Sequence, residues 1–177
     1  MTDRRRFEQQ VLPHIDAAFN LARWLTRNDH DAEDVVQDAM LRAYRHFEGL
    51  RGEARPWLLA IVRNACFSWI RRNRPAEVAA GPDAEAAEAA TAPADGPEAL
   101  LARELDRRML NKAIAALPFP FREALILREL EDLSYREIAR IANVPIGTVM
   151  SRLARARRLL AESVRVITLA SRLQTEK

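Results

Sequence analysis

The sequence is poor in the residues that build disulfides, metal sites and membrane spans. It contains one cysteine, Cys66, so no internal disulfide can form and a buried thiol is the default expectation. Its three histidines stand in separate segments without the spacing of metal ligands, and we expect no metal ion and no cofactor. There is no run of about 18 uncharged apolar residues and no signal-peptide pattern at the charged N-terminus. We therefore expect a protein that stays in the cytoplasm.

Glycine is also scarce, with 5 in 177 residues, and aromatic residues make up only 6%. Alanine, leucine, arginine and glutamate dominate, which favours helices over sheets and predicts an all-α fold. The formal net charge of +3 is unevenly distributed: residues 1–74 carry +3, residues 75–99 carry −6 and residues 134–177 carry +6. Two basic segments thus flank an acidic one.

The acidic segment 75–97 (PAEVAAGPDAEAAEAATAPADGP) contains no aromatic residue, no leucine or isoleucine, and no basic residue. It cannot bury enough apolar surface to form a core, so we predict a flexible linker. Both of its neighbours repeat apolar residues at helical spacing. The sequence therefore predicts two small helical domains, at residues 1–74 and 98–170.

The first domain is predicted to be a compact bundle of three or four helices. The first helix or helix pair ends near Asn28. The second runs from about Asp31, its predicted N-cap, to Phe47, and the third from about Pro56 to Asn73. The second helix is expected to bury one stripe of small and apolar side chains: Val35, Val36, Ala39, Met40, Ala43 and Phe47.

The second domain contains a helix-turn-helix pattern. A helix ending at Leu117 precedes a short helix from Pro120 to about Leu130. Ser134 and Glu137 then form a capping box, which predicts the start of the next helix. This helix breaks at residues 143–145 (Asn-Val-Pro), and a last, arginine-rich helix begins around residues 146–148. In DNA-binding proteins of this plan, the second helix of the motif enters the major groove.

The last helix separates apolar from polar residues. Val149, Leu153, Ala156 and Leu160 fall on one face at 100° per residue. The candidate DNA-reading residues fall together on another face: Thr148, Ser151, Arg152 and Arg155. Arginine can hold a phosphate or the edge of guanine with two hydrogen bonds. No acidic residue lies between positions 137 and 162, so ion pairing along the helix cannot explain these arginines. We interpret the face as DNA-binding.

The third helix of the first domain carries a second candidate nucleic-acid face. It places one aromatic residue among basic and polar ones: Arg63, Asn64, Phe67 and Arg71. Bases can stack on an exposed ring while arginines hold phosphates, which suits single-stranded DNA. The alternative is that Phe67 packs against a neighbouring helix, and the pattern alone does not decide between the two.

The second helix carries a candidate protein-binding face. Acidic and polar residues share the side opposite the core stripe with one leucine: Asp34, Gln37, Asp38 and Leu41. Acidic groups around an exposed leucine indicate a protein partner. A solvated face with one stray leucine is the alternative.

Three of these segments, taken together, resemble the extracytoplasmic-function sigma factors of bacterial RNA polymerase. DAEDVVQDAMLRAYRHF resembles the helix that binds core polymerase. RPWLLAIVRNACFSWIRRNR resembles the region that binds the −10 promoter element, and LSYREIARIANVPIGTVMSRLARARR resembles the helix-turn-helix that binds the −35 element. The motifs stand in the family's order and cover nearly the whole chain.

The resemblance implies a role for each candidate face. Asp34, Gln37, Asp38 and the neighbouring Leu41 would contact the polymerase. Asn64 would lie near a flipped −10 base, with the other members of its face beside it, and the polar face of the last helix would meet the −35 element. Core RNA polymerase, promoter DNA and an anti-sigma factor would be the partners, and the role would be stress-responsive. The extended linker, about 75 to 80 Å long, exceeds two DNA turns of about 34 Å each, so it could bridge two promoter elements.

Two features depart from the family pattern. Met150 stands where the family often has lysine or arginine, and the loop from Leu50 to Pro56 is short and contains proline. The −35 contact set and the −10 base preference therefore cannot be carried over from relatives.

Two other classes of function compete with the sigma-factor hypothesis. A helix-turn-helix regulator would bind duplex DNA without polymerase, but the linker and the N-terminal motifs argue against it. A nucleic-acid-processing enzyme would need clustered carboxylates for a metal ion, or a nucleophile beside a base. The densest acids, at positions 29, 31, 33 and 34, lie at a helix N-terminus, where the helix dipole accounts for them. We therefore expect a binding protein and not an enzyme.

Overall fold

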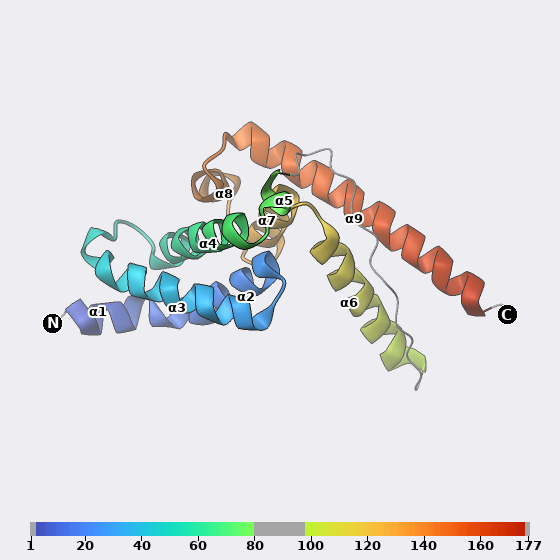
Figure 1. Cartoon of the computed structure of the whole chain (residues 1–177), viewed down its shortest axis with the longest axis horizontal. Helices are drawn as coiled ribbons and strands as arrows, with labels where there is room; N and C mark the ends of the chain where they lie inside the picture. Colours follow the sequence, from blue (N-terminus) through green and yellow to red (C-terminus); the bar gives the residue numbers. More distant parts are fainter. Residues whose placement is uncertain (1–2, 80–97, 176–177) are drawn as a thin grey trace.

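The computed structural model describes residues 3–79 and 98–175, and every regular element within these ranges is a helix. The N-terminal part contains α1 (Asp3–Gln10), η1 (Leu12–His14), α2 (Ile15–Thr26), α3 (Asp29–Arg45), η2 (Phe47–Gly49), α4 (Ala54–Asn73) and α5 (Pro75–Ala79). The C-terminal part contains α6 (Glu98–Ala116), α7 (Phe119–Glu129), α8 (Tyr135–Ala142) and α9 (Ile146–Thr175). Figure 1 shows α7 between the N-terminal bundle and the long α9. The all-α prediction is confirmed.

The N-terminal bundle is formed by α2, α3 and α4, which pack against one another. The predicted stripe of α3 is buried at Val35, Val36, Ala39 and Ala43, while Met40 is half-buried. Phe47 is buried too, but it lies in the short 3-10 helix η2 that follows α3. There its ring meets that of Phe7 edge to face, with ring centroids 5.4 Å apart. Apolar periodicity thus identified the core side chains, whereas the end of the helix was predicted two residues too late.

The predicted N-cap of α3 was wrong. Asn28, not Asp31, caps this helix: its backbone is extended, and its side-chain oxygen accepts a hydrogen bond of 3.0 Å from the Asp31 N–H. Asp29 and Asp31 lie instead in the first turn, where the helix dipole favours acidic side chains. Asn, Asp and Ser are about equally good caps, so the sequence Asn-Asp-His-Asp offered several possible starts.

The helix-turn-helix is formed by α8 and α9, as predicted. Ser134 caps α8, and the reciprocal hydrogen bonds with Glu137 form the capping box. Asn143 ends α8 in the left-handed conformation, with φ of 54°, which asparagine tolerates better than most residues. Pro145 cannot extend α8, and α9 begins at Ile146. Val149, Leu153 and Ala156 turn one face of α9 into the core.

The two parts of the chain share a continuous core through α7. All residues of α7 from Phe119 to Leu127 except Pro120 are buried, including Arg122 and Glu123. This helix contacts α2 on one side and α8 and α9 on the other, and α8 also contacts α4. The predicted linker differs at its start, because residues 75–79 form α5, which packs against α4. Residues 80–97, the rest of the predicted linker, lie outside the described ranges.

Candidate nucleic-acid interface

The predicted single-strand-binding face of α4 is only partly open. Asn64 and Arg71 are exposed, whereas the Arg63 side chain is 12% exposed and Phe67 is half-buried. Within the face, the Arg63 guanidinium lies over the Phe67 ring, 4.8 Å from its centroid, and donates a hydrogen bond of 3.3 Å to Asn64 Oδ1. The structure therefore brings three of the four predicted residues into contact with one another.

The neighbour that closes this face is α7. Arg63 forms an ion pair with Glu123, whose side chain is 1% exposed. The Phe67 ring packs against the Phe119 ring with centroids 5.8 Å apart and planes tilted by 54°. Of the two possibilities left open by the sequence, packing against a neighbouring helix is the one seen for Phe67. That neighbour belongs to the other half of the chain.

The predicted duplex-reading face of α9 is partly covered as well. Ser151 is exposed, and its hydroxyl donates a hydrogen bond of 3.0 Å to the Thr148 carbonyl. Arg152 is 3.9 Å from Glu123, and half-buried Arg155 lies over the Phe121 ring at 5.9 Å. Thr148 is also half-buried. The four residues share one side of α9, and two of them, Arg152 and Arg155, contact side chains of α7.

Two exposed apolar residues lie on α9, and the sequence analysis noted only one of them, Met150. Ile146 and Met150 are 43% and 54% exposed and lie one turn apart at the N-terminal end of α9. Half-buried Val144 and the exposed Arg136 and Arg140 of α8 line the same shallow pocket as Ile146. The sequence does place Ile146 and Met150 four residues apart, on the same side of the helix. Apolar residues of an amphipathic helix are normally expected in the core, so this spacing alone does not predict an exposed pair.

The predicted protein-binding face of α3 is open. Asp34, Gln37 and Asp38 are exposed, and Leu41 is 55% exposed. Asp38 forms an ion pair of 2.6 Å with Arg42 on the same helix. Beside this face lies an open groove of about 640 Å³, and most of its lining is apolar: Phe7, Ile15, Phe19, Val36, Met40, Leu41 and Tyr44. Asp16, Glu33 and Gln37 add polar groups to it.

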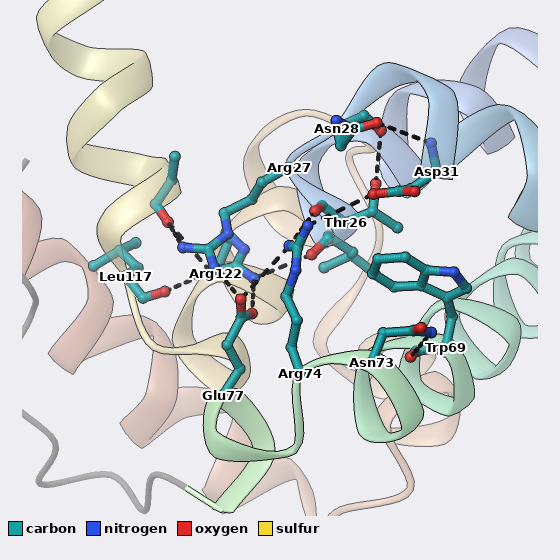
Figure 2. A network of polar contacts seen from close by, with 12 residues as sticks. Thr26, Arg27, Asn28, Asp31, Trp69, Asn73, Arg74, Glu77, Leu117 and Arg122 are labelled. Atoms are coloured by element: carbon teal, nitrogen blue, oxygen red, sulfur yellow. Dashed lines mark hydrogen bonds and ion pairs between the residues drawn. The ribbon is translucent and has the colours of Figure 1, made fainter.

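A cluster of arginines joins the two halves of the chain at the opposite end of α7 from Glu131 (Figure 2). Arg122, only 1% exposed, donates hydrogen bonds to the Leu117 carbonyl at 2.6 Å and to the Leu25 carbonyl at 3.1 Å. Its guanidinium is also 3.4 Å from the Glu77 carboxylate, which Arg27 contacts too. Burial, and then the positive charge of Arg27, lower the pKa of Arg122 to about 10.

Two features bear on the chemistry of the described part of the chain, its one cysteine and the grouping of its possible metal ligands. Cys66 is fully buried, and burial raises the pKa of its thiol to about 12, so it is held in the unreactive protonated form. Within residues 3–79 and 98–175, no group of three or more His, Cys, Asp or Glu side chains could hold a metal ion. None of the helices in those ranges is long and apolar enough to cross a membrane.

Comparison with protein families places both halves of the chain. The family described as Sigma-70 region 2 matches residues 11–76, and Sigma-70 region 4 matches residues 107–160. The sigma-E factor of Haemophilus influenzae, an ECF RNA polymerase sigma factor, is 38% identical over 152 residues, which are 81% of this chain and 79% of that protein. The chain belongs to the extracytoplasmic-function sigma factors. The sigma-factor hypothesis and its class of fold are thereby confirmed.

Other sigma factors are similar over most of the chain. The RNA polymerase sigma-H factor of Pseudomonas aeruginosa is 34% identical over 170 residues, covering 92% of this chain and 88% of that protein. A co-crystal structure of the sigma factor RpoE with the anti-sigma factor NepR from Bartonella quintana contains a similar chain. The TM-score is 0.69 at 31% identity, over 92% of this chain and 98% of that one. This sigma factor is therefore similar to other sigma factors both in sequence and in three-dimensional structure.

Proposed function

We propose that this sigma factor divides promoter recognition among three helices. The open face of α3 docks on core RNA polymerase, α4 captures single-stranded DNA of the −10 element, and α9 reads duplex DNA of the −35 element. The exposed face of α3 carries this proposal, because a chain that only bound DNA would have no need for an acidic surface with an exposed leucine beside an apolar groove. Its action is binding, not catalysis.

The docking face has the chemistry of a protein interface. Leu41 supplies an exposed apolar anchor, and the groove beside it is lined by aromatic and aliphatic side chains. Asp34 and Asp38 add negative charge that repels DNA phosphates and suits a basic partner. The face is therefore directed at polymerase, whereas the basic faces of α4 and α9 are directed at nucleic acid.

The two DNA faces suit different forms of DNA. On α4, Asn64 is exposed for a base edge and Arg71 for a phosphate. Once freed from Phe119 and Glu123, Phe67 would offer a ring for stacking of an unpaired base and Arg63 a guanidinium group for a phosphate. On α9, exposed Ser151 lies one turn after the helix start, the part of a recognition helix that contacts base edges. Arg152 and Arg155 would reach guanine or phosphate once freed from their present contacts.

The relatives suggest the setting in which this function is used. The RpoE structure shows a sigma factor held by an anti-sigma factor, and we infer that this chain is controlled by such a partner in response to stress. Promoter binding and polymerase binding both take place in the cytoplasm of a bacterium, so we place the protein there. The acidic linker segment would connect the two DNA-binding parts across the promoter.

Run-off transcription from a panel of promoter DNAs tests the proposed function. Purified core polymerase is assayed with and without this chain, and binding of the chain to core is measured in parallel. Promoter-specific transcripts that appear only with the chain are expected. Absence of transcripts, combined with no core binding and tight binding of the chain alone to duplex DNA, would favour a helix-turn-helix regulator.

The docking role of α3 has a separate test. Leu41→Arg places a charge at an exposed apolar position and should weaken core binding by at least about tenfold, with little effect on stability. Val166→Arg is the matched control, because Val166 is 66% exposed on α9 in the other half of the chain. If Leu41→Arg and Val166→Arg bound core polymerase with equal affinity, α3 would not be part of the docking surface.

A further inference from the structure

The open surface at the start of α9 is not the basic part of this helix. Of the four residues predicted to read duplex DNA, only Ser151 is exposed. Arg152 and Arg155 are half-buried against side chains of α7. The exposed residues of the first turns are uncharged: Ile146, Gly147, Met150, Ser151 and Ala154. The surface that the proposed recognition helix offers to solvent is therefore made of apolar and small side chains.

Ile146 and Met150 form the apolar edge of this surface, and we call them the apolar ridge. They are 43% and 54% exposed and lie one turn apart on the same side of α9. A single exposed apolar residue is ordinary on a protein surface. Two of them side by side at the start of a recognition helix are a surface whose burial by a partner would release hydrophobic free energy.

Positive charge flanks the apolar ridge on the side of α8. Arg136 and Arg140 are exposed, lie one turn apart on α8, and line a shallow pocket together with Ile146. No acidic residue lies between positions 137 and 162 of the sequence. A partner that covers the ridge therefore has to bring negative charge together with an apolar group.

Duplex DNA offers both kinds of group within one groove. Its phosphates are negatively charged, and thymine projects a C5-methyl group into the major groove, where apolar side chains can contact it. Guanine presents hydrogen-bond acceptors on the same edge and suits arginine or lysine, whereas Met150 has no donor for them. Methionine is also unbranched and flexible, so its side chain can adapt to a methyl group in the groove. The chemistry of the ridge thus favours thymine over guanine.

The ridge occupies the part of the motif that reads bases. In helix-turn-helix proteins, the N-terminal residues of the second helix contact base edges. Ile146 is the first residue of α9, and Met150 follows one turn later, next to the exposed Ser151. Figure 1 shows this end of α9 near α8 at the upper edge of the molecule, away from α1, α2 and α3.

Gly147 indicates that an outside body comes close to the start of α9. A Cβ atom at this position would meet no other atom within 4 Å, so the packing of the chain does not require glycine there. Glycine nevertheless weakens a helix relative to alanine. A DNA backbone lying against the helix start accounts for it, because the N–H groups of a first helical turn bind phosphates at short range.

From these observations we propose that Met150, supported by Ile146, determines specificity by contacting the C5-methyl group of a thymine in the −35 element. Arg136 and Arg140 hold phosphates at the edge of the same groove. The −35 element of this sigma factor therefore carries a T·A pair opposite Met150, and guanine is disfavoured at that place. This inference rests on the proposed function of α9 and adds to it a base contact that needs no hydrogen bond.

Replacement of thymine by deoxyuridine tests the proposal, because uracil pairs as thymine does and lacks only the C5-methyl group. Holoenzyme reconstituted from core polymerase and the full-length chain first selects its preferred −35 sequence from promoter DNA randomised in that element. Each thymine of the selected sequence, on either strand, is then replaced singly by deoxyuridine, and binding is measured by competition. We expect one position at which the replacement weakens binding about fourfold, as the burial of one methyl group predicts.

Variants of Met150 assign that position to its side chain. Met150→Ala should bind the thymine and deoxyuridine duplexes equally there and keep the preferences of the wild type elsewhere. Met150→Arg should change the preferred base at that position from thymine to guanine, because it supplies two hydrogen-bond donors. Val166→Ala is the matched control: Val166 is 66% exposed on the same helix, and its variant should keep both the affinity and the fourfold loss of the wild type.

Arg140→Ala separates base reading from phosphate binding. It should weaken binding to all promoter sequences alike and reduce the dependence of affinity on salt, while the loss caused by deoxyuridine stays about fourfold. A change of base preference in this variant would contradict the division of roles between the ridge and the two arginines of α8. Circular dichroism of every variant establishes that its helices are intact.

The possible outcomes separate this inference from the proposed function. A selected −35 sequence without thymine, or with no position sensitive to deoxyuridine, would overturn the methyl contact, keep the sigma-factor role and point to an acidic protein as the partner of the ridge. A position that stayed fourfold sensitive in Met150→Ala would show that another residue makes the contact. If holoenzyme formed but selected no −35 sequence at all, the reading role of α9 would be wrong and this inference with it.

Discussion

At the scale of single residues, the buried charges of the described chain are all concerned with holding the two halves together. Arg122, Glu123 and Glu131 are each at most 3% exposed, and each bonds to a residue of the N-terminal half. A buried charge is costly unless it is paired, so each of these side chains must keep its partner as long as it stays buried. In the sequence, the same residues look like the polar side of a surface helix.

Cys66 should be protected from thiol reagents in the folded protein. The thiol is fully buried, and burial raises its pKa from 9.0 to about 12. We expect its reaction with a chromogenic disulfide reagent at pH 8 to be at least on the order of a hundredfold slower than in denaturant. A native rate within a few-fold of the denatured rate would contradict the buried placement.

The same pKa predicts how stability depends on alkaline pH. The folded state holds the thiol proton more tightly than the unfolded state, whose pKa is near 9.0. The contribution of Cys66 is complete below pH 9 and falls as the pH rises from 9 toward about 12. A Cys66→Ala variant should lose this part of the alkaline slope of the unfolding free energy in urea titrations, while a slope identical to wild type would show that another group causes it.

Arg152→Ala should weaken binding to the −35 element and leave core polymerase binding intact. Removal of one arginine contact to a base or phosphate costs about 1–3 kcal/mol in DNA affinity. Binding of the holoenzyme to a cognate promoter and binding of the variant to core are measured separately. Arg165→Ala, an exposed position farther along α9, is the control. If a folded Arg152→Ala variant lost core binding, the role assigned to this residue would be wrong.

At the scale of helices, capping explains where several elements begin. The capping box at Ser134 was identified from the sequence because two local signals agree there, a hydroxyl at the N-cap and a glutamate three residues later. At α3 the only signal was a polar side chain suited to the N-cap, and Asn28, Asp29 and Asp31 could each supply it. The structure selects Asn28, since its extended backbone follows Arg27, which ends α2 with φ of 59°.

Ser134→Ala should destabilise the helix-turn-helix. It removes the 3.2 Å hydrogen bond from the Glu137 N–H to the serine hydroxyl, at a cost of about 1 kcal/mol in unfolding free energy. Hydrogen bonds from the Ser134 N–H and hydroxyl also lower the pKa of Glu137, so its contribution is present above the unfolded pKa near 4.5 and lost as the pH falls. Urea unfolding at pH 7 and pH 4 measures both effects, with the exposed Ser68→Ala as control. If the difference in unfolding free energy between Ser134→Ala and Ser68→Ala were as large at pH 4 as at pH 7, this role of Glu137 would be wrong.

At the scale of the whole molecule, the two halves form a single packed body through α7. Its apolar residues belong to a core that continues from α2 and α4 into α8 and α9. The arginine cluster around Glu77 (Figure 2) adds polar bonds across the same boundary: Arg122 donates to the Leu25 carbonyl of α2, and Arg27 donates to the Ala115 carbonyl of α6. Cations near helix C-termini are favourable, which offsets part of the cost of gathering three arginines.

Arg122→Met should show how much this boundary contributes to stability. The substitution puts an unbranched apolar side chain in place of the arginine. It leaves the Leu25 and Leu117 carbonyls without the Arg122 donor and removes one of the three arginines around the Glu77 carboxylate. We expect the unfolding free energy to fall by about 3 kcal/mol, measured by urea denaturation. The exposed Arg158→Met should change it by less than about 0.5 kcal/mol. If Arg122→Met and Arg158→Met changed the unfolding free energy equally, the arginine cluster would not stabilise the packing of the two halves.

The sequence by itself determined the all-α class, the core stripes of α3 and α9, the helix-turn-helix with its capping box, and the faces that carry Asp34, Asn64 and Ser151. These features depend on neighbours within about one or two helical turns, so periodicity and capping chemistry are enough to find them. Only the tertiary structure decided that Phe67 meets Phe119, that Arg63 and Arg152 share Glu123, and that Glu77 lies among three arginines. Those partners are separated by up to 60 positions along the chain, from Arg63 to Glu123. Which distant faces meet is set by the packing of whole helices around α7, and no local pattern encodes it.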